Sequence, residues 1–132
     1  MRIAKSFLDE IIAHSLEDLP NECCGMVSGS GGAATEVFRA FNALASPMSF
    51  NIESTDLHRI YTTIEDRGED LLAIYHSHTK SVAEPSQQDR NQARLWPDPV
   101  WLICSLADPG NPVVRGWDMR DDKVSEVELE IE

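Results

Sequence analysis

The stretch Leu71-Leu72-Ala73-Ile74-Tyr75-His76-Ser77-His78 decides how this chain folds and where its chemistry lies. The five apolar residues at 71–75 are the strongest buried-strand signal in the chain. Residues two apart on an extended segment point to the same side. His76 and His78 are therefore expected together at the carboxyl end of a strand, where two imidazoles can bind a metal ion.

A second polar group follows His78 after seven residues, in Ser86-Gln87-Gln88-Asp89. A carboxylate from a neighbouring element can complete a three-ligand tetrahedral site and leave the fourth position for water, as catalytic zinc requires. We therefore expect zinc bound by His76, His78 and Asp89. Ser-x-x-Asp is also the spacing of a helix capping box, so Ser86 can cap a helix, donate to a developing oxyanion, or do both.

An acidic candidate for a general base lies upstream in Pro20-Asn21-Glu22-Cys23-Cys24-Gly25, just before an apolar run that predicts a strand. Taken alone, Glu22 is typical of a surface acid. Cys23 or Cys24 acting with a histidine would give a thiol peptidase, which leaves the His-x-His pair unexplained. Together these residues suggest a zinc hydrolase.

The pattern resembles the JAMM or MPN-type metallopeptidases, whose motif is a distant Glu, His-x-His, seven residues, Ser, two residues and Asp. The positions that fit it without a gap are Glu22, His76, His78, Ser86 and Asp89. The resemblance extends over nearly the whole chain and includes Asn42 and Ser46-Pro47. One departure is Thr79, because many eukaryotic deubiquitinating members have Pro there. In this respect the chain looks more like the bacterial Mec branch.

The resemblance implies a function in cysteine biosynthesis. Mec-like enzymes release cysteine from the C-terminus of a ubiquitin-like sulfur carrier, so the implied partner is a carrier with a Gly-Gly-type tail. It also implies one Zn²⁺ per chain and Glu22 as the general base. The alternatives are an isopeptidase acting on larger ubiquitin-like conjugates and a metal-free MPN interaction module. Such modules usually lose ligands, whereas this chain has the complete set.

Composition sets further bounds. At 132 residues, with 42% hydrophobic and 26% charged residues, the chain is expected to form a single domain over 1–132. The formal net charge of −12 argues against nucleic acid and anionic membranes as partners. Asp9 and Glu10 interrupt any signal-peptide core, no apolar run reaches membrane-spanning length, and three cysteines imply no disulfide framework, so we expect a cytoplasmic protein. The oligomeric state is left open.

The remaining patterns predict an α/β fold. Helices are expected at 6–19, at 54–67 with Ser54 as N-cap, and from Ser86 to before Trp96. Strands are expected at 25–29, 36–40, 50–52, 71–75, 100–105, 113–119 and 124–131. This order gives a mixed sheet with helices packed on it. The family resemblance makes it a curved sheet similar to the cytidine deaminase fold, although the deaminase motifs themselves are missing.

Three further expectations concern polar residues near these elements. Ser77 should point away from its flanking histidines and make a supporting hydrogen bond. His14 and His58, which lack ligand spacing, are expected to be hydrogen-bonded core residues. The cysteines are expected to be small buried fillers.

Overall fold

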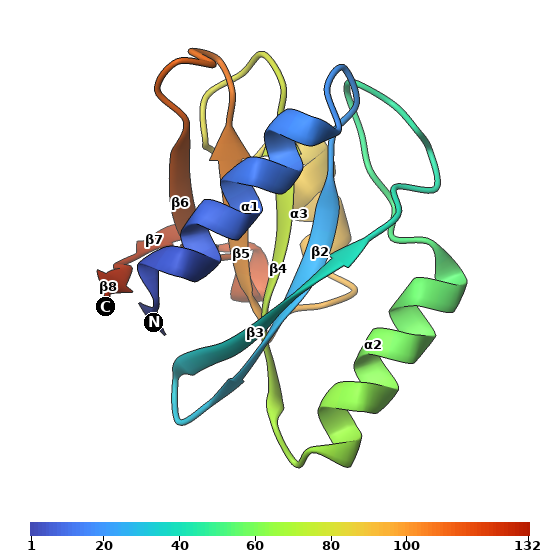
Figure 1. The fold of residues 1–132 in the computed structure, drawn as a ribbon, viewed down its shortest axis with the longest axis vertical. Helices are drawn as coiled ribbons and strands as arrows, with labels where there is room; N and C mark the ends of the chain where they lie inside the picture. Colours follow the sequence, from blue (N-terminus) through green and yellow to red (C-terminus); the bar gives the residue numbers. More distant parts are fainter.

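The computed structural model describes all of residues 1–132, and one mixed β-sheet runs through it (Figure 1). The strands are β1 (Arg2–Ile3), β2 (Cys24–Ser30), β3 (Ala33–Ala40), β4 (Asp70–His78), β5 (Val100–Ser105), β6 (Val113–Asp118), β7 (Ser125–Val127) and β8 (Glu130–Ile131). The helices are α1 (Lys5–Glu17), α2 (Ser54–Asp66) and α3 (Gln87–Ala93), with a 3₁₀ turn at Arg120–Asp122. The order of strands in the sheet is β7-β6-β5-β4-β2-β3-β1-β8.

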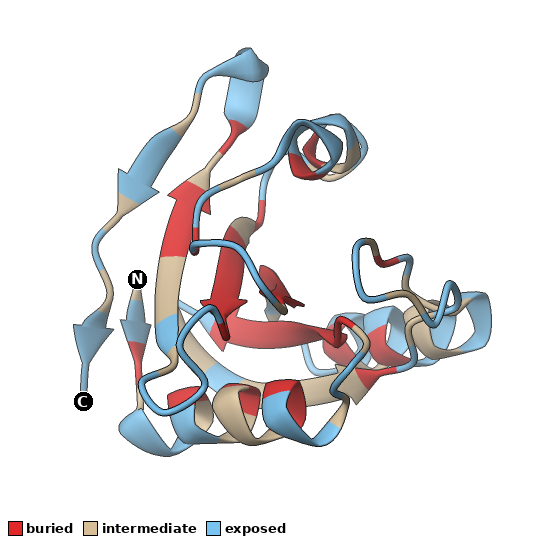
Figure 2. Ribbon diagram, turned by 90° about the horizontal axis from the view of Figure 1, so that it is seen from above, coloured by how far each residue is buried: buried red, intermediate tan, exposed pale blue.

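β4 occupies the middle of the sheet, antiparallel to β2 and parallel to β5. It extends beyond the predicted 71–75 to include His76, Ser77 and His78, because β5 continues to pair with it up to His78 opposite Ser105. The sheet is curved, with helices on both of its faces (Figure 2). The predicted α/β architecture of a mixed curved sheet flanked by helices is thus confirmed.

The alternation of side chains along the central strands gives each face of the sheet its own core. On one face, Tyr75, Val27 and Leu102 pack with Leu8 and Ile11 of α1. On the other face, Ile74, Met26 and Trp101 pack with side chains from α2 and α3, including Ile60 and Ala93. His76 and His78 follow Ile74 at two-residue intervals, so they belong to the face covered by α2 and α3.

Several local predictions are confirmed within two residues at each end, including the helices α1 and α2. The strand predicted at 100–105 is β5 without any shift. Other predictions are wrong. The N-cap of α2 is Glu53, whose carboxylate accepts from the Thr55 and Asp56 amides. The strand expected at 50–52 is reduced to one isolated bridge between Asn42 and Ile52.

The single strand predicted for 124–131 is also wrong. It is divided into β7, which pairs with β6 at one end of the sheet, and β8, which pairs with β1 at the other. The curvature of the sheet brings its two ends together, so two strands separated only by residues 128–129 join opposite edges. Ile131 at the end of the chain is 61% exposed, so this segment does not bury a continuous apolar face.

No helix in the structure combines the length and the apolar composition that crossing a membrane would require.

His14 is a buried, hydrogen-bonded residue as expected, with Nδ1 2.7 Å from the Tyr75 hydroxyl. His58 is exposed instead of lying in the core. It falls on the outer side of α2, whose inner side carries Ile60 and Ile64.

Candidate metal centre

His76 and His78 lie at the end of β4 with their Nε2 atoms 3.1 Å apart. Both side chains are buried. The Phe50 ring stacks on His76, with ring centroids 4.4 Å apart and planes inclined by 19°. Strand pairing fixes the backbone of the two histidines and stacking holds the His76 ring, so both imidazoles are oriented toward one point.

Hydrogen bonding indicates which nitrogen of His78 is free. Its Nδ1 lies 2.8 Å from the Val82 carbonyl oxygen, which can only accept, so Nδ1 carries the proton. In a neutral ring Nε2 is then an acceptor, yet it faces Asp89 Oδ2, another acceptor, at 2.9 Å. His76 Nδ1 is buried without a partner, and its Nε2 faces the same centre. A metal cation would satisfy these converging lone pairs.

Asp89 reaches the histidines from the first turn of α3. Its Oδ1 lies 3.0 Å from His76 Nε2, and its Oδ2 lies 2.9 Å from His78 Nε2. Ser86 forms the predicted capping box, because its Oγ accepts from the Asp89 amide at 3.1 Å and its own amide donates to Asp89 Oδ2 at 2.9 Å. Burial alone would raise the pKa of Asp89, but the two histidines beside its carboxylate hold it well below its usual range. The carboxylate therefore remains charged.

Glu22 lines the same cleft from the loop between α1 and β2. Its side chain is only 6% exposed, and burial raises its pKa to about 7, although the neighbouring His78 opposes the rise. The cluster of mutually close ligand atoms contains only His76, His78 and Asp89, so Glu22 stands outside it. A carboxyl group that titrates near neutrality and is not a metal ligand can both accept and return a proton.

Asn42 ties the loop before α2 to Glu22. Its Nδ2 donates to the Glu22 carbonyl at 3.0 Å and to the Ser49 carbonyl at 2.9 Å. Its Oδ1 accepts from the amides of Leu44 at 3.0 Å and Asn51 at 3.1 Å. The sequence pattern indicated Asn42 only as part of a family resemblance. An Asn is a common turn residue, but no local signal predicts a bond to a residue twenty positions away.

The same loop is fastened at two more points. The Glu22 amide donates to the Ser46 carbonyl at 2.8 Å, and the Thr79 hydroxyl donates to the Pro47 carbonyl at 2.9 Å. The loop thereby forms one wall of a cleft of about 480 Å³. The cleft is lined by Glu22, Pro47, Met48, His78, Thr79, Lys80, Ser81, Ser86 and Asp89. Of the predicted site residues, only the fully buried His76 is missing from its surface.

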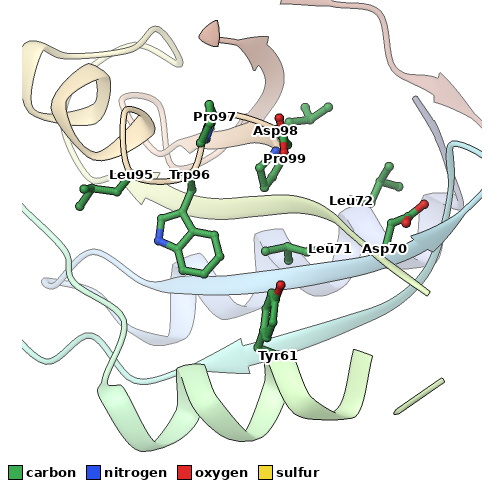
Figure 3. Close-up of a pocket in the computed structure, with 10 residues that line it drawn as sticks. Tyr61, Asp70, Leu71, Leu72, Leu95, Trp96, Pro97, Asp98 and Pro99 are labelled. Carbon is green, nitrogen blue, oxygen red and sulfur yellow. The ribbon is translucent and has the colours of Figure 1, made fainter. Parts of the chain in front are cut away.

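A larger hollow, of about 560 Å³, lies at the opposite end of β4 (Figure 3). There Tyr61 of α2 and Trp96 have ring centroids 6.0 Å apart, and both lie beside Leu71. Its titratable side chains are Asp70, Asp98 and Tyr61, without a histidine or cysteine. Of these two hollows, the smaller one, beside His78, therefore contains candidate catalytic and metal-binding side chains.

The cysteines do not form a nucleophilic site. Cys23, Cys24 and Cys104 are all buried, as expected. Burial raises the pKa of Cys23 to about 11 and raises that of Cys24 further, so neither is a thiolate at neutral pH. Ser77 points away from the histidines, and its hydroxyl accepts from the Cys23 amide at 2.8 Å, as predicted. This hydrogen bond ties the end of β4 to the residue before β2.

Residues 4–120 match the family described as prokaryotic homologs of the JAB domain. The chain is 30% identical over 126 residues to the CysO-cysteine peptidase of Mycobacterium tuberculosis, covering 94% of this chain and 86% of that protein. It is 34% identical over 112 residues to the desampylase of Haloferax volcanii, covering 80% of each.

Solved structures give the same result for the fold. A protein from Desulfitobacterium hafniense, solved in solution, superposes with a TM-score of 0.87 at 30% identity, over 99% of this chain and 92% of that one. A crystal structure of a JAB1/MPN domain protein from Archaeoglobus fulgidus superposes with a TM-score of 0.63 at 20% identity, over 99% of this chain and 98% of that one.

Proposed function

This chain belongs to the JAMM/MPN family of hydrolases, and on that premise we propose that it is a zinc peptidase acting on the C-terminal tail of a ubiquitin-like carrier protein. The names of its relatives, a CysO-cysteine peptidase and a desampylase, support this substrate class. The released residue is cysteine on this proposal, since the mycobacterial relative aligns with 94% of the chain. The carrier tail is of the Gly-Gly type, and residues 1–132 act as one domain.

The metal is zinc on this proposal, and its ligands are His76, His78 and Asp89. Bond lengths of about 2.0–2.1 Å in a tetrahedral site separate neighbouring ligand atoms by about 3.3 Å. The separations of 2.9–3.1 Å between these three side chains are close to that value. When bound, zinc would supply Lewis acidity toward the scissile carbonyl and toward a water molecule.

The side chains of the cleft perform the proton transfers. Glu22 takes a proton from the attacking water as the water oxygen bonds to the carbonyl carbon. As the C–N bond breaks, Glu22 returns the proton to the leaving amine, so the products are an amine and a carboxylic acid, which then ionises. The Ser86 hydroxyl donates to the developing oxyanion while its oxygen still accepts from the Asp89 amide.

One observation carries this proposal. Three ligand atoms converge on one point, and two of the residues that supply them line the same cleft as a buried carboxyl group whose pKa is about 7 and which is not a ligand. The test is cysteine release from a carrier protein ending in Gly-Gly-Cys by the zinc-loaded protein, with Glu22→Gln as the inactive control. If the wild-type protein releases no cysteine, or if Glu22→Gln releases it at the wild-type rate, the proposal is contradicted.

A second candidate is the removal of carrier proteins from lysine side chains of target proteins. The desampylase relative favours this activity. The wall of the cleft formed by residues 43–51 favours the first candidate, because it is a short loop closely tied by Asn42 and Thr79. A comparison of kcat/KM between a carrier–cysteine adduct and a carrier–lysine isopeptide, at equal zinc content, decides between the two.

A further inference from the structure

Lys80 is the only cationic side chain other than histidine that lines the cleft. It is exposed and forms no ion pair within the chain, whereas Lys5 pairs with Asp9 at 2.9 Å. The chain has 23 acidic residues against 11 Lys and Arg, so most of its surface repels anions. An unpaired ammonium group at the edge of the cleft is a local exception to that charge.

The other charged groups of the cleft cannot bind an anionic part of the substrate. Glu22 and Asp89 are carboxylates, and Ser81 and Ser86 supply only neutral hydroxyls. Lys80 offers three donors on a flexible stem. A negatively charged group of the substrate that enters the cleft beside the ligands would therefore meet Lys80 as its side-chain partner.

The position of Lys80 matches one such group. Lys80 follows His78 by two residues, which separates their Cα atoms by at most about 7 Å. In a substrate that ends in a single leaving residue, the free α-carboxylate is attached to the same carbon as the scissile nitrogen. The carboxylate must then lie within a few ångströms of the metal ligands when the scissile carbonyl is bound.

We infer that Lys80 binds the α-carboxylate of the leaving residue and so selects substrates from which one C-terminal amino acid is released. This inference rests on the proposed function and deepens it. A lysine isopeptide carries no carboxylate next to the scissile nitrogen, so Lys80 gives it no advantage. The charge of Lys80 thereby distinguishes release of a free amino acid from deconjugation of a protein.

The experiment uses two forms of one ubiquitin-like carrier ending in Gly-Gly-Cys, with a C-terminal carboxylate or a carboxamide. The enzymes are the full-length wild type, Lys80→Ala, Lys80→Arg and, as a charge-matched control, Lys123→Ala. Lys123 is also exposed and lies outside the cleft. All four are compared at equal zinc content by kcat/KM for cysteine or cysteine amide release.

We expect the wild type to prefer the carboxylate form by about 10- to 100-fold, the range for one hydrogen bond to a charged group. Lys80→Ala should lose that preference by slowing only on the carboxylate form. Lys80→Arg should retain most of it, and Lys123→Ala all of it. An equal loss on both forms, or a preference that survives in Lys80→Ala, overturns the inference alone. If the wild type cleaves neither form, the proposed function fails and the inference fails with it.

Discussion

The side-chain amide of Asn42 donates to the backbone carbonyl of Glu22 across 3.0 Å, which couples the loop before α2 to the proposed general base. All four hydrogen-bonding positions of the Asn42 amide are occupied, and every partner is a backbone group. The contact therefore fixes the backbone position of Glu22 without touching its carboxyl group.

The Asn42→Asp variant tests this coupling. Aspartate still offers oxygen to the Leu44 and Asn51 amides, but it loses the two N–H donors. The Glu22 and Ser49 carbonyls would therefore face a carboxylate. We expect the free energy of unfolding to fall by about 1–3 kcal/mol, the cost of unsatisfied polar groups. kcat should fall because Glu22 is displaced, with zinc content unchanged. The control is Asn111→Asp, an exposed position far along the chain. Wild-type kcat in Asn42→Asp would remove the positioning role.

The Glu22→Gln variant should separate activity from metal binding. The amide is nearly isosteric and cannot accept a proton from water. Turnover should fall by about 10²-fold or more, the range for loss of general acid–base catalysis, while zinc content stays at the wild-type level. Parallel measurement of kcat and zinc content checks this. A variant that turns over normally would exclude Glu22 from the mechanism.

The same substitution should make the zinc-free protein more stable at high pH. The folded-state pKa of Glu22 is about 7, above its ordinary value of 4.5. Between these values the folded state binds more protons than the unfolded state, so stability falls as pH rises and the loss is complete above about pH 7. Glutamine avoids this loss. Chelator-treated Glu22→Gln should exceed wild type by up to about 3 kcal/mol at pH 8 and match it near pH 4. Equal unfolding curves at pH 8 would contradict the raised pKa.

Ser86 combines a helix cap with a proposed oxyanion donor, and two variants separate these roles. Glycine at an N-cap costs only a few tenths of a kcal/mol, whereas alanine costs about 1 kcal/mol. Both variants remove the hydroxyl, so both should lose about 10²–10³ in kcat if it stabilises the oxyanion. Denaturant unfolding and kcat are measured together. Full activity in Ser86→Gly would leave Ser86 as a cap only.

Gly25 is required by the packing of Tyr75. A Cβ atom at this position would lie 2.3 Å from Tyr75 Cε1 and 2.4 Å from the Phe38 carbonyl oxygen. Neither an aromatic ring in the core nor a strand backbone can move aside cheaply, so Gly25→Ala should cost about 1–3 kcal/mol or more. The control is Gly32→Ala, where a Cβ would meet open space but the φ of +80° is unfavourable. Equal stability of Gly25→Ala and wild type would contradict this packing.

Much of the fold follows from local patterns. The apolar run at 71–75 predicted the central strand, and the Ser86 spacing predicted the cap of α3, because each signal is complete within a few residues. β1 was not predicted, and the single strand predicted at 124–131 did not anticipate that β8 would pair separately with β1. Each is two residues long, and their pairing joins Arg2 to Glu130 across the whole sequence. No periodicity exists in a segment of that length.

In the candidate site, too, local spacing predicts some contacts and not others. The spacing of His76, His78 and Asp89 predicted that they would meet, and the structure brings their ligand atoms within 4.8 Å of one another. The four bonds of Asn42 and the stacking of Phe50 on His76 depend on how a loop returns to the sheet. Such contacts are made by tertiary packing, which local sequence does not encode.

The central claim is that His76, His78 and Asp89 hold a zinc ion that the reaction requires. Its most direct test is the zinc content of purified wild type, Asp89→Ala and His78→Ala, measured by elemental analysis beside cysteine release. We predict one zinc per chain in the wild type, little in either variant, and activity that disappears with a chelator and returns with zinc. Full zinc occupancy in Asp89→Ala or His78→Ala, or wild-type activity that survives removal of the metal, would contradict the account.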